Sequence, residues 1–111
     1  MSVKESFDKI DSAIAKNPEK ATSVDSVFQF EFTGDEAGSY AIDLRQSTTE
    51  NFVTEGTHAD ANVTIKMADS DWLGILSGKV NPMPAFMMGK IKVEGDMGLA
   101  MKLQSILSLA Q

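Results

Sequence analysis

Residues 27–33 read Val-Phe-Gln-Phe-Glu-Phe-Thr, which places an aromatic ring at every second position. Polar side chains fill the positions between Phe28, Phe30 and Phe32. Because successive side chains of a strand point to opposite faces, this period of two predicts a strand with one apolar and one polar face. The three rings need a covering layer, so we expect a sheet with helices packed on one side.

The residues around this strand extend the same pattern into a sheet. Residues 34–38 supply turn chemistry, and residues 40–45 alternate again, so the two strands should form a hairpin. Further strands are predicted near residues 51–55, over residues 62–67 and over residues 90–94. We expect the first four strands to form an antiparallel meander.

A helix is predicted at the start of the chain, over residues 2–17. Its apolar residues recur at spacings of three and four, with charged residues between them. Ser2 and Glu5 match a capping box, which marks the beginning of the helix. Asn17 precedes Pro18, where the helical conformation is disfavoured, and this marks the end.

Three more helices are predicted over residues 69–78, 81–89 and 96–110. Asp69 and Asp96 are good N-cap residues for the first and last of them. After its N-cap, the last segment carries a single charged residue. So apolar a helix must be covered on most sides or must lie over apolar material.

Composition indicates one domain and restricts its partners. The chain has 111 residues, 42% of them apolar, so one domain over residues 1–111 would bury about 65% of the unfolded surface. The formal net charge is −6 and the basic residues are scattered, which argues against nucleic acid and against strong binding to anionic membranes. Transient membrane contact remains compatible with this composition. There is no cysteine, so neither a disulfide nor a thiolate metal site can form.

No targeting segment is predicted. Charged residues interrupt the first ten positions, where a signal peptide needs an apolar core, and no later apolar run is long enough to cross a bilayer. We therefore expect a soluble intracellular protein. Separately, we predict that it is a monomer.

Residues capable of catalysis are few. The single histidine, His58, lies in a polar stretch and is interpreted as a plain surface-loop residue, so a catalytic triad is poorly supported. Asp69 and Asp71 stand at a predicted helix start, where carboxylates satisfy free N–H groups, and capping is favoured over acid–base chemistry. With one histidine and no cysteine, a zinc site would have to be built largely from carboxylates, which is unusual for that metal, so we predict no metal. We also predict no cofactor.

Methionine is unusually frequent in the C-terminal half. After the initiator, six methionines occur between Met67 and Met101. Methionine is unbranched and polarizable, so it suits irregular cavities and surfaces that accept many apolar shapes. Ordinary core filling is the alternative interpretation. Together with the surplus apolar surface of the last predicted helix, the methionines favour a hollow core around an apolar ligand.

Three motifs in this half resemble a known family. They are Met-Ala-Asp-Ser-Asp-Trp at 67–72, Gly-Lys-Val-Asn-Pro at 78–82, and the stretch 89–103, Gly-Lys-Ile-Lys-Val-Glu-Gly-Asp-Met-Gly-Leu-Ala-Met-Lys-Leu. Together they resemble the signature of the sterol carrier protein-2 family. The N-terminal half is similar more loosely, through the opening helix and the strands that contain Phe28 and Tyr40.

The resemblance implies an α+β fold: a five-stranded, largely antiparallel sheet with helices over one face, enclosing an apolar tunnel. It implies a protein that carries fatty acids, fatty acyl-CoAs, phospholipids or sterols and does not transform them. A carboxylate head group would need a donor at the cavity mouth; Lys16, Lys20 and Arg45 are the candidates, although a role as solvated surface residues is favoured for each. The candidate lining residues are Phe28, Phe30, Phe32, Val63, Ile65, Met67, Trp72, Ile75, Leu76, Phe86, Met87, Ile91, Leu99, Leu103, Ile106 and Leu107.

The sequence departs from the family pattern at its C-terminus. It ends Leu109-Ala110-Gln111, whereas family members often end in a peroxisomal Ser-Lys-Leu-type tripeptide, so a cytoplasmic location is favoured over a peroxisomal one. Family domains also occur fused to enzymes. A non-catalytic module that presents acyl-CoA or another apolar substrate to a partner enzyme is therefore the main alternative. A protein-interaction domain with a docking helix, and a hydrolase using Asp69 or Asp71, are weaker alternatives.

Overall fold

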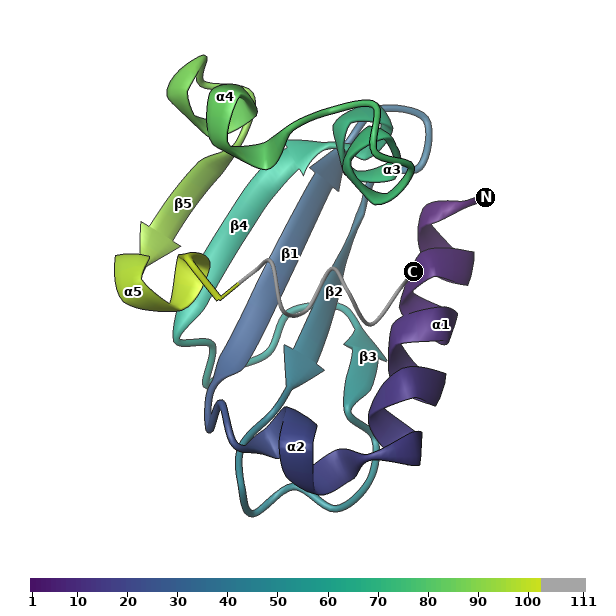
Figure 1. Ribbon diagram of the computed structural model, residues 1–111, viewed down its shortest axis with the longest axis vertical. Coiled ribbons are helices and arrows are strands. Elements are labelled where there is room, and N and C mark those ends of the chain that lie inside the picture. The colour runs from purple at the N-terminus through teal and green to yellow at the C-terminus, as the bar shows by residue number, and fades with distance from the viewer. Residues whose placement is uncertain (103–111) are drawn as a thin grey trace.

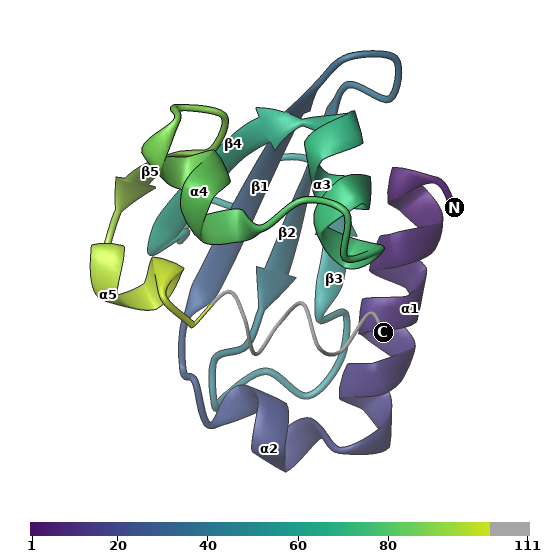
Figure 2. The ribbon, with the colours of Figure 1, turned by 45° about the horizontal axis from the view of Figure 1, so that its top comes forward.

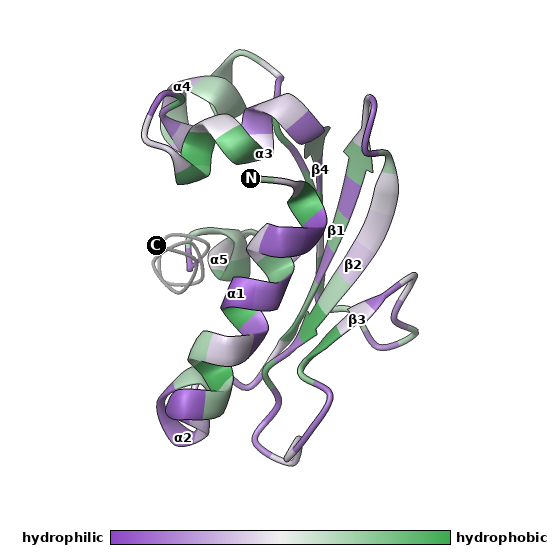
Figure 3. Ribbon diagram, turned by 90° about the vertical axis from the view of Figure 1, so that its right-hand side faces the viewer, coloured by the Kyte–Doolittle hydropathy of each residue, from purple (hydrophilic) through white to green (hydrophobic). Residues whose placement is uncertain are grey.

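The computed structural model describes residues 1–102 (Figure 1). These residues form one five-stranded sheet with helices on one of its faces (Figure 3). In chain order the elements are α1 (Val3–Lys16), α2 (Pro18–Thr22), β1 (Val27–Thr33), β2 (Gly38–Asp43), β3 (Val53–Glu55), β4 (Val63–Ala68), α3 (Asp69–Leu76), α4 (Pro82–Met87), β5 (Lys92–Gly95) and α5 (Met97–Ala100). The predicted α+β class is confirmed.

The strand order is β3-β2-β1-β4-β5, so the predicted four-strand meander is wrong. β4 does not lie beside β3. It crosses to the far side of β1 and pairs with β1 in parallel, while the other three pairings are antiparallel. The sheet is thus mixed, although largely antiparallel as expected. Alternation along a strand indicates which side chains share a face, but it does not identify the neighbouring strand.

Polar side chains form hydrogen bonds that hold the segment connecting β3 to β4. The Gln29 side chain is 1% exposed and points away from the phenylalanines of β1. It donates a hydrogen bond to the Gly56 carbonyl at 3.0 Å and accepts one from the His58 N–H at 2.8 Å. The Asn62 side-chain oxygen accepts from the Val27 N–H at 2.8 Å. These bonds hold residues 56–62, the crossover loop, against the sheet face that the helices leave open.

The opening helix agrees with the sequence analysis. The capping box is present, since Ser2 Oγ accepts from the Glu5 N–H at 3.0 Å and the Glu5 carboxylate accepts from the Ser2 N–H at 3.3 Å. The apolar stripe that contains Phe7 and Ile10 is buried against the sheet. A second short helix, α2, follows at once and was not predicted.

The C-terminal elements differ from prediction at their ends. Ala68 is the N-cap of α3, and Asp69 is the first helical residue instead of the cap. The Asp69 carboxylate accepts from the Glu36 N–H at 2.7 Å, so it holds the β1–β2 turn to the start of α3. β5 begins two residues later than predicted, at Lys92. Asp96 does cap α5, and the predicted helix beyond residue 102 lies outside the described residues.

None of the helices formed by residues 1–102 has the length and apolar character needed to cross a bilayer.

Candidate functional site

The apolar side chains of β1 and β4 form one surface under the helices. β1 and β4 are parallel and in register, so residues directly beside each other share a face. The six apolar residues that β1 and β4 contribute to this surface are each at most 4% exposed. The pairs are Phe28–Val63, Phe30–Ile65 and Phe32–Met67. We call these six residues the inner face; β1 and β4 contribute no charged side chain to it.

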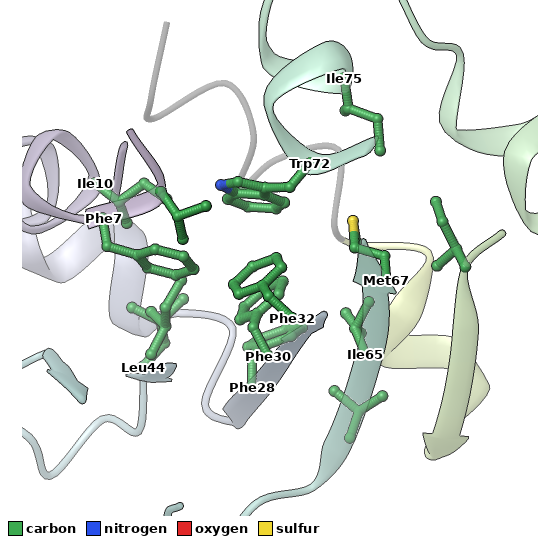
Figure 4. Close-up of a cluster of buried hydrophobic side chains, with 14 of the residues drawn as sticks. Phe7, Ile10, Phe28, Phe30, Phe32, Leu44, Ile65, Met67, Trp72 and Ile75 are labelled. Atoms are coloured by element: carbon green, nitrogen blue, oxygen red, sulfur yellow. The ribbon is translucent and has the colours of Figure 1, made fainter. Parts of the chain in front are cut away.

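Trp72 joins the inner face to two helices. Its indole N–H donates to Ser6 Oγ at 2.8 Å, and the Ser6 hydroxyl donates to the Val3 carbonyl at 2.6 Å. The Trp72 ring stacks on the Phe7 ring with centroids 5.3 Å apart, and Phe7 stacks on Tyr40 at 4.5 Å. α1 and α3 therefore meet in one aromatic cluster (Figure 4). Tyr40 adds β2 to this cluster. The only polar atom of the Trp72 side chain is already satisfied by protein.

The phenylalanines of β1 pack directly against this cluster. The Phe30 ring lies 5.2 Å from Trp72 and 5.5 Å from Phe7, and the Phe32 ring lies 5.6 Å from Trp72. Separations of this size are those of contacting aromatic side chains. A ligand that touched Phe30 or Phe32 here would replace contacts between rings. The enclosed tunnel therefore stays a prediction.

The other predicted lining residues fall into three groups. Ile75 and Ile91 are 5% and 4% exposed, and Leu76 and Leu99 are partly buried against the same core. Phe86 and Met87 are 39% and 82% exposed, so they lie outside the packed core of the described chain. Leu103, Ile106 and Leu107 lie outside the described residues.

Phe7 is a central residue of the cluster that was not among the predicted lining residues. It contacts Phe30, Phe32, Tyr40 and Trp72. The signal was present in the apolar stripe of the opening helix. That stripe indicated burial, but it did not indicate which part of the sheet the helix would cover.

A polar cluster occupies the opposite side of the sheet, around the crossover loop. Arg45 Nη2 lies 2.8 Å from Asp43 Oδ2, and Arg45 Nη1 lies 3.3 Å from Asp60 Oδ2. Hydrogen bonds from Arg45 and Thr48 hold the pKa of Asp43 well below its usual range, against the opposing effect of burial. Arg45 is thus engaged away from the inner face, which removes its suggested role with a lipid head group.

The interpretation of His58 as a plain surface residue is wrong. Its side chain is 18% exposed, and Nε2 lies 3.5 Å from Asp43 Oδ2. Nδ1 accepts from the Asp60 N–H at 3.0 Å, so the neutral ring carries its proton on Nε2, facing Asp43. The ring therefore helps to attach the crossover loop. Within residues 1–102, no group of three or more metal-binding side chains is gathered.

The family assignment rests on the sequence match. The SCP-2 sterol transfer family matches residues 7–108 of the chain. The chain belongs to this family. Among curated proteins it is 36% identical over 106 residues to hydroxysteroid dehydrogenase-like protein 2 of Xenopus laevis, and 34% identical over 104 residues to sterol carrier protein 2 of Homo sapiens. These alignments cover 95% and 90% of this chain but only 24% and 19% of those proteins.

Solved structures confirm the SCP-2 fold. Sterol carrier protein 2 from Yarrowia lipolytica, in its apo form, superposes with a TM-score of 0.77 at 25% identity, covering 95% of this chain and 88% of that one. The palmitated SCP2L2 protein from Aedes aegypti gives a TM-score of 0.74 at 29% identity, covering 96% and 95%. This chain therefore shares its fold with these two sterol carrier proteins.

Proposed function

We propose that this SCP-2 domain binds and transfers lipids, and that it carries fatty acids, fatty acyl-CoAs, phospholipids or sterols against its inner face. The observation that carries the proposal is the inner face itself, a charge-free apolar surface that spans two parallel strands under a helical layer. Membership of the SCP-2 family supports lipid binding in general. The palmitated Aedes aegypti structure supports an acyl chain as one ligand.

Burial of the hydrocarbon would supply most of the affinity. Each methylene moved from water to an apolar site contributes about 0.8 kcal/mol, so a long acyl chain binds strongly without directional contacts. The Trp72 N–H is already bonded to Ser6, so it is not free to bind a lipid head group. We therefore propose broad specificity, decided by length and volume more than by hydrogen bonds.

We propose no catalytic role for this chain, because its candidate acid–base residues are engaged elsewhere. The Asp69 carboxylate, the leading acid–base candidate, accepts hydrogen bonds from the backbone of Glu36 and Ser70. The Asp43 and His58 pair lies on the opposite side of the sheet from the inner face. Both groups are thus engaged in contacts that hold the fold together.

A second candidate function is a non-catalytic module that presents acyl-CoA or another apolar substrate to a partner enzyme. It is favoured by one observation: the chain spans about a quarter or less of the curated relatives that it matches. Lipid exchange between donor and acceptor vesicles by the isolated chain would support the carrier. Tight lipid binding without exchange would support the presenting module.

The first experiment is a titration of delipidated protein with a fluorescent fatty acid, followed by competition with palmitate and with cholesterol. We expect saturable one-to-one binding that palmitate displaces, and the competition ranks acyl chains against sterols. A folded protein that binds neither would overturn the proposal. Analytical ultracentrifugation of the same sample tests the further proposal that residues 1–111 form a single monomeric domain, and fractionation of cells tests the proposed cytoplasmic location.

A further inference from the structure

A group of large apolar side chains on and just after α4 is open to solvent. Met83, Met87 and Met88 are 63%, 82% and 72% exposed, and Phe86 is 39% exposed. We call these four residues the α4 patch. Four large exposed apolar side chains within six residues of a small domain indicate a surface for interaction.

The other side of α4 is attached to the core, so the α4 patch faces away from it. Ala85, in the middle of α4, is 3% exposed and belongs to the core. The Lys90 N–H donates to the Ala85 carbonyl at 2.9 Å, and Ile91, the next residue, is 4% exposed. Figures 1 and 2 both place α4 beside β5 and away from α1. One face of α4 is therefore fixed to the core, and the patch lies on the remainder.

The charge around the patch is opposite to that of the rest of the chain. Residues 72–93 contain three lysines and no acidic residue, a formal charge of +3, whereas the whole chain carries −6, which leaves −9 elsewhere. Lys79 precedes α4 in the chain, Lys90 follows it, and both are exposed. Neither forms an ion pair with another described residue. Both are available to an external anion.

We propose that the α4 patch, with Lys79 and Lys90, docks the protein on the surface of an anionic phospholipid bilayer. The inference rests on the proposed lipid-carrying function and names the surface through which the carrier meets a membrane. Methionine and phenylalanine side chains enter the boundary between head groups and acyl chains, and the lysines meet the phosphates. The acidic remainder of the chain is repelled, which orients the molecule with α4 toward the bilayer.

The composition of the patch favours a lipid surface over a protein partner. The segment Pro-Met-Pro-Ala-Phe-Met-Met at residues 82–88 has no side chain that can donate a hydrogen bond or carry a charge. Specific protein interfaces surround their apolar centre with polar contacts. Partition into a bilayer needs only apolar area and a positive border, and these are the two features present.

Vesicle co-sedimentation of the full chain separates the contribution of apolar contact from that of the lysine charges. Met83→Glu/Met88→Glu removes apolar contact, and both side chains are exposed, so the fold is retained. Lys79→Glu/Lys90→Glu reverses the border charge. Lys4→Glu/Lys9→Glu on the exposed side of α1 makes the same charge change at a distance and serves as the matched control. Vesicles of phosphatidylcholine alone are compared with vesicles that also contain phosphatidylglycerol.

We expect the lysine variant to lose about tenfold or more in partition onto anionic vesicles, since one basic residue near such a surface contributes about fivefold. High salt should abolish that difference, because it screens the phosphates. The methionine variant should bind both vesicle types more weakly than the wild type. The control variant should lose much less than the lysine variant. Equal losses in the lysine and control variants would overturn the proposal.

A single label gives a second measurement, because the chain has no cysteine. An environment-sensitive dye on Met88→Cys should shift to the blue on anionic vesicles, while the same dye on Ser12→Cys of α1 should not. Palmitate titration of each variant in solution runs in parallel. If the wild type takes up palmitate but ignores all vesicles, the docking proposal fails and lipid carrying survives. If it does neither, the proposed function fails as well.

Discussion

Ser6 shows how one small side chain connects two helices. It is fully buried in α1, and its hydroxyl accepts from the Trp72 indole while donating to the Val3 carbonyl. A buried indole N–H without a partner is costly, because it has lost its hydrogen bonds to water. The position of Trp72 over the inner face therefore depends on a residue that the sequence pattern treats as an ordinary helical serine.

Ser6→Ala is expected to destabilise the protein by about 1–3 kcal/mol, the cost of a buried unsatisfied donor. Urea denaturation followed by Trp72 fluorescence measures it. Ser12→Ala, an exposed change on the same helix, should be neutral or slightly stabilising, because alanine favours helix. Equal effects at the two positions would show that the hydrogen bond to Trp72 contributes nothing.

Gly95 is required by both conformation and space. Its φ is +100°, and a Cβ there would lie 2.6 Å from the Asn62 carbonyl oxygen. Gly56 has a φ of +98° with open space around the same position. Substitutions at these two glycines therefore distinguish the cost of backbone strain from the cost of a steric clash.

Gly95→Ala should cost at least about 1 kcal/mol more than Gly56→Ala, because only the former adds a clash to the strain that a positive φ imposes. Thermal melts of the two variants against wild type test this. A Gly56→Ala variant that is as damaged as Gly95→Ala would mean that the close approach to Asn62 is unimportant.

At the scale of elements, the alternation of β1 predicted its faces correctly, but the crossover from β3 to β4 was not predictable. The four backbone pairings use groups that every residue carries, so local patterns do not specify partners. Gln29, Asp43 and Arg45 contact the crossover loop at Gly56, His58 and Asp60. Polar residues on the open face therefore stabilise the crossover, and these contacts join residues that are far apart in the sequence.

The Asp43 carboxylate should make the attachment of the crossover loop sensitive to acid. Its pKa is lowered in the folded chain, chiefly by hydrogen bonds from Arg45, so its stabilising contribution is present above the unfolded pKa of about 4 and is lost as the pH falls below it. Asp43→Asn should therefore cost about 2 kcal/mol near neutral pH and progressively less in acid.

Denaturation midpoints of wild type and Asp43→Asn over a series of pH values test this expectation. Asp11→Asn, an exposed change on α1, is the control and should leave the pH dependence of wild type intact. A constant difference between wild type and Asp43→Asn at all pH values would contradict the ionic origin of the effect.

For the whole molecule, the helical layer and the inner face form one core. Its aromatic cluster combines residues from α1, β1, β2 and α3. A ligand that binds against this core stabilises the folded chain by linkage, because the unfolded chain has no assembled face.

Palmitate at a hundred times its dissociation constant should stabilise the delipidated protein by about 2.7 kcal/mol. Calorimetry at increasing palmitate concentration measures the rise in melting temperature. A short-chain acid such as butyrate should give almost no rise, since few methylenes are buried. Equal shifts with both acids would indicate binding at a surface charge instead of the core.

The sequence by itself determined the properties that depend on near neighbours. The period of two in residues 27–33 indicated the inner face, and the side chains of Ser2 and Asp96 indicated where helices begin. These features follow from backbone geometry and hydrogen bonds within a few residues.

Only the tertiary structure decided what depends on distant segments. β4 pairs with β1 and not with β3, and Gln29 holds the crossover loop that joins β3 to β4. Asp69 accepts a hydrogen bond from Glu36 instead of acting as an N-cap, because the β1–β2 turn lies beside it. Met87 was expected in the lining but lies in the open, because Ala85 is the side chain of α4 that the core accepts. Burial depends on which elements meet, and a local pattern does not contain that information.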